Sequence, residues 1–290
     1  MSPQVSLKPE MNTLRTDRFR FFVFVKKRAD MTMEEFDRYW LEVHSKVFLK
    51  FIAGKEGLLK YEQLHVNQVE KARLKSIGVP VLDYDGVGLF DVDSFEKFAA
   101  LLDEGYIRDV VPDEEKFILR EESVVVRAKI ASIVDCDEDL LIAAQMASAG
   151  SPYLKLPTNL RKDRSRMLFT FNVMEGVDLS QVWLRDHANV VKATPLGQSI
   201  IKYEQLHPTE PVSGFTDNHD AELPHWDGVA LIDVPSFNLF KDPVSKRMLA
   251  EDEAKWQAPG TLSMLPIDVA TIIDVDVAPA YEASLLLGKL

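Results

Sequence analysis

Cysteine is almost absent from this sequence: Cys136 is the only one among 290 residues. A single cysteine excludes an internal disulfide and fits a reducing compartment, so we expect a cytoplasmic protein. No apolar run is long enough to span a membrane, and the first residues lack the charged-then-apolar pattern of a secretory signal. We therefore expect no membrane-spanning segment.

Positive charge is also in deficit, because 34 Lys and Arg stand against 46 Asp and Glu, a formal net charge of −12. Nucleic acids and anionic membranes bind basic faces, so this balance argues against both as partners. The chain further lacks a Gly-rich phosphate loop, a Gly-x-Ser-x-Gly turn, a Cys/His dyad and the ligand spacing of a metal site. We therefore expect no metal and no cofactor.

What the sequence does contain is an internal repeat. A Trp-x-x-x-His segment at 40–44 precedes a Tyr-x-Gln-x-His segment at 61–65, and the pair returns at 183–187 and 203–207. The first segment has helical spacing, and the second has the period of a strand, so each places its side chains on one face. The distance between the copies is of domain size, which indicates a duplicated domain rather than a solenoid.

We place the first domain at 17–137, a linker at 138–165, the second domain at 166–276 and an apolar tail at 277–290. The expected strands are 19–25, 58–66, 86–92 and 124–134 in the first domain, and 167–173, 201–207, 228–234 and 267–275 in the second. Helices are expected to begin at Thr32, Ser94, Asp178 and Ser236, and again at 112–117, with a polar loop before Val79.

The order in each domain is β-α-β-β-α-β, a ferredoxin-like unit of the α+β class. All strands are apolar on both faces, so we expect the two sheets to pack against each other as an intramolecular pseudo-dimer. Because this packing buries both sheets, we expect a monomer or a weak homodimer. The apolar residues 285–287 of the tail are the candidate for any association.

Four motifs of the first copy together resemble a known family, the EthD domain of the dimeric α+β barrel superfamily. They are Thr32-x-x-Glu-Phe-x-x-Tyr-Trp-x-x-Val-His44, Lys60-Tyr-x-Gln-x-His65, Asp85-Gly-Val and Asp113-Glu-x-x-Phe117. The resemblance covers most of 19–135 and is more degenerate over 167–275. It implies that the two fused units form an intramolecular dimeric α+β barrel, whereas most family members are single domains that dimerise.

The resemblance also implies a class of chemistry. The family and its relatives include cofactor-free enzymes that tailor polyketides and aromatic metabolites, such as decarboxylases, dehydratases and cyclases. We therefore expect a cofactor-independent lyase that acts on an aromatic or polyketide-like small molecule. A cofactor-free monooxygenase, an isomerase and a non-catalytic binding barrel remain as alternatives, because one fold hosts many chemistries.

His44 and His187 are the candidate catalytic residues. The resemblance places them in the cleft between sheet and helices, where a neutral imidazole can take up a proton and return it. The alternative is a histidine that anchors its helix by a hydrogen bond. The first copy keeps more of the family pattern, including the 113–117 segment, whereas the second has Val182 for Tyr39 and Pro243 within its second helix, so we expect His44 to matter more.

The remaining candidates are polar or aromatic residues expected to bind substrate. The strand side chains could donate hydrogen bonds to a carbonyl or phenolate, or simply form a polar strand face; they are Tyr61, Gln63, His65, Tyr203, Gln205 and His207. Asp85 and Asp227 each precede a glycine. They could act as carboxylate bases, or they could simply be turn residues. Trp40 and Trp183 are expected to stack on substrate or to fill the core.

Overall fold

The computed structural model describes residues 11–136, 160–209 and 225–274. The expected C-terminal tail and most of the expected linker lie outside these residues. The first half contains β1 (Phe19–Val25), α1 (Met33–Tyr39), a π-helix (Trp40–His44), α2 (Ser45–Ile52), β2 (Leu58–Val66), α3 (Gln68–Ser76), β3 (Gly86–Val92), α4 (Phe95–Leu101), α5 (Glu104–Asp109), α6 (Val111–Glu114), a 3-10 turn (Arg120–Glu122) and β4 (Val124–Asp135).

The second half repeats this order with fewer helices. It contains β5 (Ser165–Phe171), α8 (Leu179–Gln181), a π-helix (Val182–His187), α9 (Ala188–Ala193), a 3-10 turn (Gly197–Ser199), β6 (Lys202–Pro208), β7 (Gly228–Val234), a 3-10 helix (Phe237–Lys241), α10 (Pro243–Glu253) and β8 (Ser263–Asp274).

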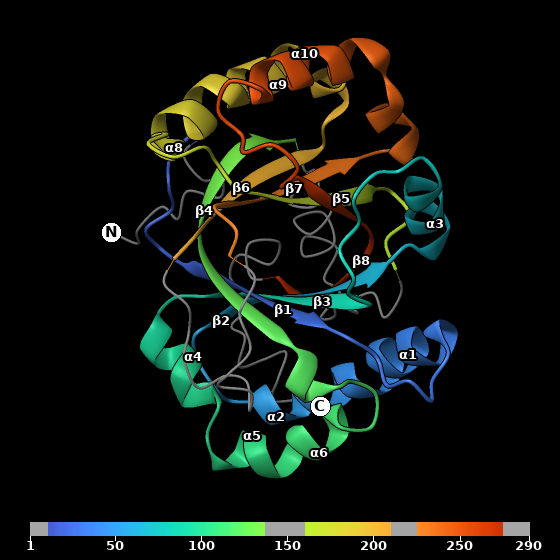
Figure 1. Cartoon of the computed structure of the whole chain (residues 1–290). Coiled ribbons are helices and arrows are strands. Elements are labelled where there is room, and N and C mark those ends of the chain that lie inside the picture. Colours follow the sequence, from blue (N-terminus) through green and yellow to red (C-terminus); the bar gives the residue numbers. More distant parts are fainter. Residues whose placement is uncertain (1–10, 137–159, 210–224, 275–290) are drawn as a thin grey trace, which may run out of the picture.

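The eight strands form one closed antiparallel barrel in the order β1-β3-β2-β8-β5-β7-β6-β4. The two halves meet where β2 pairs with β8 and β4 pairs with β6. Our expectation of two sheets that merely pack face to face is therefore corrected: their edges are hydrogen-bonded into a single sheet. Closure pairs the backbone groups that an open edge strand would leave exposed. The helices of the two halves cover opposite sides of the barrel (Figure 1).

Strands that are apolar on both faces are explained by this arrangement, because one face of each strand points into the barrel and the other toward the helices. On β1, Phe22 and Phe24 belong to the barrel core, whereas Phe21 packs on the ring of Phe98 from α4. Alternation with period two separates the two sets. The barrel interior is thus a packed core, and the outer faces remain available for pockets beneath the helices.

The helix starts follow local capping signals. Thr32 and Glu35 form the expected capping box, and Ser94 and Asp178 cap their helices through side-chain oxygens. The polar loop expected before Val79 is wrong in part, since 68–76 form α3 with Asn67 as its N-cap. Pro243 does not interrupt a helix either. It begins α10 directly after the cap Asp242, a position where proline is tolerated because its N–H is not needed.

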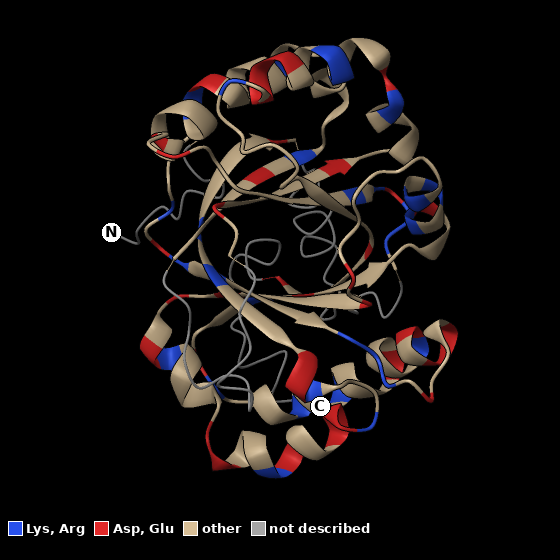
Figure 2. Cartoon of the chain, in the orientation of Figure 1, with Lys and Arg blue, Asp and Glu red and all other residues tan. Residues whose placement is uncertain are grey.

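Two buried charge clusters join the halves at the inner face of the barrel. Arg20 donates to Asp91 at 2.6 Å and to Glu204 of the other half at 2.5 Å. Arg166 repeats this arrangement with Asp233 and, across the seam, with Glu62 at 2.6 Å. Figure 2 shows acidic and basic positions among the mostly uncharged residues of the barrel strands. Each guanidinium therefore ties two strands of its own half to one strand of the partner half.

The charges in these clusters stay ionised because they face each other. Burial opposes ionisation of Glu62, but Arg166 and Lys60 outweigh it and hold its pKa well below its usual range. A carboxyl whose pKa is lowered by folding stabilises the native state above its unfolded pKa of about 4.3. That stabilisation is lost as the pH falls through the lower folded value.

Glu62→Ala should therefore destabilise the protein, because it leaves one buried arginine short of a counter-charge. We expect a loss of about 3–5 kcal/mol in the free energy of unfolding, measured by urea denaturation at neutral pH. The control is Glu122→Ala, which removes a partly exposed partner of Lys26 and should change stability by less than about 1 kcal/mol. Equal effects of the two variants would show that the buried cluster does not hold the halves together.

Candidate functional site

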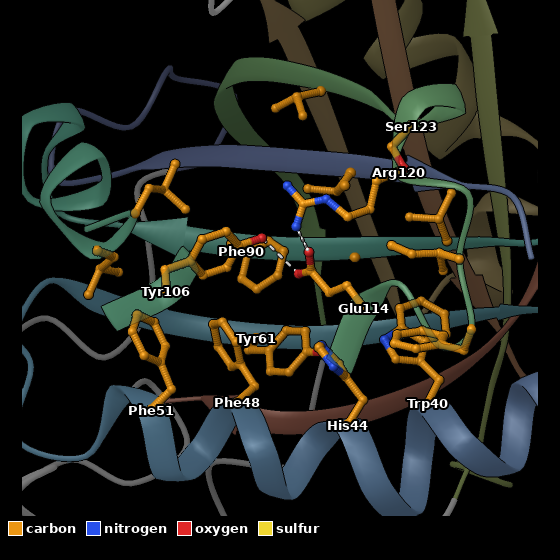
Figure 3. A pocket seen from close by; sticks show the side chains of 18 of the residues that line it. Trp40, His44, Phe48, Phe51, Tyr61, Phe90, Tyr106, Glu114, Arg120 and Ser123 are labelled. Atoms are coloured by element: carbon orange, nitrogen blue, oxygen red, sulfur yellow. Dashed lines mark hydrogen bonds and ion pairs between the residues drawn. The ribbon is translucent and has the colours of Figure 1, made fainter. Parts of the chain in front are cut away.

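A pocket lies between the outer face of the strands and the helices in each half. The first, around His44, is a cavity of about 110 Å³ whose wall is largely aromatic (Figure 3). Its aromatic lining consists of Trp40, Phe48, Phe51, Tyr61, Phe90, Phe98, Tyr106 and Phe117. The second, around His187, is a cavity of about 190 Å³. Both are concave, mainly apolar and supplied with a few polar groups, as ligand sites usually are.

A π-helical turn positions the histidine in both halves. In the first half it spans Trp40–His44 and leads directly into α2. The carbonyl of Trp40 accepts from the amide N–H of Ser45, five residues on, and also from Nε2 of Gln63 at 2.8 Å. The second half repeats this with Gln205 donating to the carbonyl of Trp183 at 2.7 Å. Such turns are rare and occur often at functional sites.

A carboxylate fixes each histidine. Nδ1 of His44 lies 2.9 Å from Asp113, whose other oxygen accepts from the hydroxyl of Tyr39 at 2.6 Å. Burial opposes ionisation of Asp113, but hydrogen bonds from His44 and Tyr39 outweigh it and lower its pKa to about 2. An ionised carboxylate only accepts hydrogen bonds, so the proton sits on Nδ1 and Nε2 is left as a base.

His187 is held in the same way. Its Nδ1 lies 2.8 Å from Asp252, which also accepts from the indole N–H of Trp256 at 3.3 Å. The hydrogen bond from His187 is the main cause that lowers the pKa of Asp252. The histidine-to-carboxylate pair is therefore a property of both halves, and it is the feature that the two sites share most closely.

A second carboxyl group faces each pocket, one residue after the histidine's partner. Glu114 accepts from the hydroxyl of Tyr106 at 2.7 Å and from Arg120 at 2.5 Å (Figure 3). Burial raises its pKa, against the opposing effects of His44 and Arg120. Burial likewise raises the pKa of Glu253, which lines the second pocket. Each pocket thus combines an oriented imidazole with a carboxyl group that burial pushes toward its neutral form.

Our reading of the sequence did not assign these four carboxylates to the site. The signal was available, because Asp113-Glu-x-x-Phe117 recurs as Asp252-Glu-x-x-Trp256. The expectation that this segment distinguishes the first copy from the second is therefore wrong. Acidic residues on short helices resemble ordinary solvated positions, and only the fold places them opposite a histidine from another element.

Six of the twelve candidate site residues line the pockets. Trp40, His44 and Tyr61 line the first pocket, and their counterparts Trp183, His187 and Tyr203 line the second. The structure also shows which way the Tyr-x-Gln-x-His face of the strand points. Its side chains point toward the helices, while Glu62 and Glu204, between Tyr and Gln, point into the barrel.

The other strand residues of that face do not line either pocket. Gln63 is occupied by the carbonyl of Trp40 and the hydroxyl of Tyr61, and Gln205 makes the same two bonds in its half. The ring of His65 packs at a tilt against Trp40, and its Nδ1 lies 2.7 Å from Asp37. In the structure these three side chains support the π-helical turn and its surroundings, and their contact with substrate stays a prediction.

His207, Asp85 and Asp227 also lie outside the pocket linings. His207 stacks on Trp183, and burial together with Lys129 lowers its pKa to about 4, so it is neutral. Asp85 accepts from the amide N–H of Lys27 at 3.0 Å, and Asp227 does so from Val173 at 2.8 Å. Both aspartates therefore fix the turn before a strand, the alternative that their Asp-Gly sequence had left open.

The described ranges contain neither a metal-binding cluster nor a membrane-spanning helix. Across 11–136, 160–209 and 225–274, no group of three or more His, Cys, Asp or Glu is placed to hold a metal ion. In the same ranges no helix is both long and apolar enough to cross a bilayer.

Comparison with known proteins finds a family model that matches part of the first half. Residues 28–121 match the model of the EthD domain, and this segment includes His44, Asp113 and Glu114. No curated protein matches the chain. The residue pattern quoted above for this family is therefore confirmed over the first half.

Solved structures resemble the chain over most of its length. One is described as a candidate monooxygenase from Fusobacterium nucleatum, 6% identical, with a TM-score of 0.50 over 87% of this chain and 92% of that one. An anthrone oxidase-like protein is 10% identical, with a TM-score of 0.48 over 88% and 92%. A mutant chlorite dismutase from Candidatus Nitrospira defluvii is 10% identical, with a TM-score of 0.49 over 93% and 95%. At identities this low the similarity concerns the fold alone. Of these three structures, only the one from Fusobacterium nucleatum reaches a TM-score of 0.50, so only it supports the fold assignment.

Gln63→Met should test the structural role of the buried amide. The variant leaves the carbonyl of Trp40 and the hydroxyl of Tyr61 each without one hydrogen bond, at an expected cost of about 1–3 kcal/mol. Thermal unfolding should show this loss, and Gln205→Met should show a similar one in the second half. If Gln63→Met left stability unchanged but weakened ligand binding, Gln63 would be a substrate contact after all.

Proposed function

We propose that this protein is a cofactor-independent enzyme that moves protons on an aromatic or polyketide-like small molecule, most simply as a lyase. The observation that carries the proposal is the first pocket, where His44 is oriented by Asp113 beside Glu114 in an aromatic cavity. An oriented base beside a carboxyl group that can donate a proton, in one apolar pocket, is what elimination, decarboxylation and aldol-type closure require.

In an elimination, Nε2 of His44 would take a proton from the carbon next to a carbonyl. The electron pair left on that carbon forms the new double bond, and the hydroxyl on the neighbouring carbon departs. Glu114 in its neutral form gives its proton to that hydroxyl, which leaves as water. His44 then returns its proton to Glu114, directly or through solvent, and both groups are restored.

The surrounding side chains favour a flat substrate. Tyr61 and Phe90 stack with a centroid distance of 4.7 Å, and Phe48 lies against both rings. Aromatic faces of this kind attract the face or edge of another ring. An isomerase would use the same residues, with His44 returning its proton to a second carbon of the substrate.

We also propose that the chain arose by duplication of a ferredoxin-like unit and acts in the cytoplasm as a monomer or weak homodimer. Support comes from the strand order, in which each half contributes its fourth, first, third and second strands in turn. Because each barrel strand is paired on both sides, no edge is left that needs a second chain. Sedimentation velocity should show a single species near 32.9 kDa at micromolar concentration; a tight higher oligomer would contradict this.

His44→Ala should abolish most of the acid–base activity of the protein. A suitable probe is 5-nitrobenzisoxazole, which opens to a coloured cyanophenolate when a base removes its ring proton. Loss of the base should lower the rate by about 10²-fold or more, whereas His187→Ala should have a smaller effect. Melting temperatures of both variants separate loss of chemistry from loss of folding.

The reverse result would reassign the active half. If His187→Ala abolished turnover in a folded protein and His44→Ala did not, the second pocket would be the catalytic one. Asp113→Asn is a matched companion, since it keeps the shape of the carboxylate but no longer fixes the proton on Nδ1. It should lower the rate in the same direction as His44→Ala.

A further inference from the structure

The two pockets share a histidine-to-carboxylate pair but differ around the second carboxyl group. Glu114 is paired with Arg120 and with the hydroxyl of Tyr106. In the second copy the position of Arg120, seven residues after the histidine's aspartate, is Pro259. Among the described residues, the carboxyl group of Glu253 forms neither an ion pair nor a hydrogen bond. The second pocket therefore has no fixed counter-charge for its acid.

The second pocket also has a different shape and wall. Part of it comes from the first half of the chain, because Leu74 of α3 and the following Ile77 and Val79 line it. The wall is richer in aliphatic side chains than that of the first pocket, among them Leu249 and Met264, and it also contains the aromatic residues Phe169, Phe171, Trp183, Tyr203, Phe240 and Trp256. An apolar cavity of roughly 150 Å³ holds benzene, so a cavity of about 190 Å³ has room for a small aliphatic molecule.

We propose that the second pocket is a separate binding site for a neutral, largely aliphatic molecule with a carbonyl oxygen, which accepts a hydrogen bond from the carboxyl group of Glu253. The aliphatic wall receives the hydrocarbon part, and the carboxyl group is the only acid that faces the pocket without a partner in the described residues. This inference concerns binding alone and does not depend on the reaction proposed for the first pocket.

The charged groups around Glu253 support a neutral ligand. On the π-helix of the second half, His187 is bonded to Asp252. On α3, Arg73 lines the pocket but is held by two bonds to Glu70, and Lys246 of α10 is exposed. Lys246 also lines the pocket, but its charge stays in solvent. A carboxylate ligand buried beside Glu253 would thus meet an unpaired acid while the two cations of the lining are ion-paired or solvent-exposed, at a high desolvation cost.

The test is a calorimetric titration of the full chain with 2-nonanone, compared with nonanoate, which has a similar chain and a negative charge. We expect the ketone to bind at least about tenfold more tightly than the carboxylate at neutral pH. Ala230→Phe fills the second pocket and should abolish ketone binding. Gly88→Phe is the matched control, since Gly88 takes the same place in the first pocket and the change should leave ketone binding intact.

Protonation of Glu253 gives an independent readout. Its pKa is raised by burial, so wild-type affinity for the ketone should fall as the pH rises through that value. Glu253→Gln keeps an N–H donor at every pH, so its affinity should stay constant. Leu249→Trp is a second way to fill the pocket if Ala230→Phe fails to fold.

Three results would overturn the inference: nonanoate binding as tightly as the ketone, loss of ketone binding in Gly88→Phe, or full binding in a folded Ala230→Phe. None of them bears on turnover of the benzisoxazole by His44. Conversely, an inactive first pocket would leave the ketone titration unaffected, so the two proposals fail separately.

Discussion

The ion pairs across the barrel seams are the constraint from which the rest of the structure follows. Arg166 reaches Glu62 of the other half, and Arg20 reaches Glu204. An uncompensated charge in a barrel interior is costly, so each seam has one favoured register. Side chains alternate along a strand, and a slip by one residue would turn Glu62 outward and its neighbours inward. The pairs therefore decide which side chains of β2 and β6 face the helices.

That register builds the site. With Glu62 inside, Tyr61 and Gln63 point toward the helix layer, and the amide of Gln63 meets the carbonyl of Trp40. This bond fits a π-helical turn, in which the carbonyl is displaced from the regular helical pattern, and His44 lies at the end of that turn. The histidine then faces Asp113, which comes from a helix near the other end of the same half. A charge inside the barrel thus fixes the position of a base outside it.

The sequence predicts the repeat, the strands, the helix caps and both histidines, because each of these follows from a pattern of residues that are close together in the chain. It does not predict the paired seams, since edge pairing depends on the closure of two sheets that are far apart in sequence. The π-helical turn is not predicted for the same reason, because the residue that binds its displaced carbonyl, Gln63, belongs to another element. Gln63 and Tyr61 share a strand face, so period two cannot tell that one contacts the pocket and the other supports a helix.

The internal repeat of the sequence accounts for where the two pockets agree and where they differ. Both copies retain the histidine, its aspartate and the following glutamate, so the histidine alone cannot distinguish an active half from an inactive one. The difference lies next to the glutamate, where Arg120 of the first copy is Pro259 in the second. Arg120 opposes the effect of burial on the pKa of Glu114, whereas Glu253 has no such cation beside it. A single difference beside a shared pair thus leaves one buried acid ion-paired and the other without a partner among the described residues.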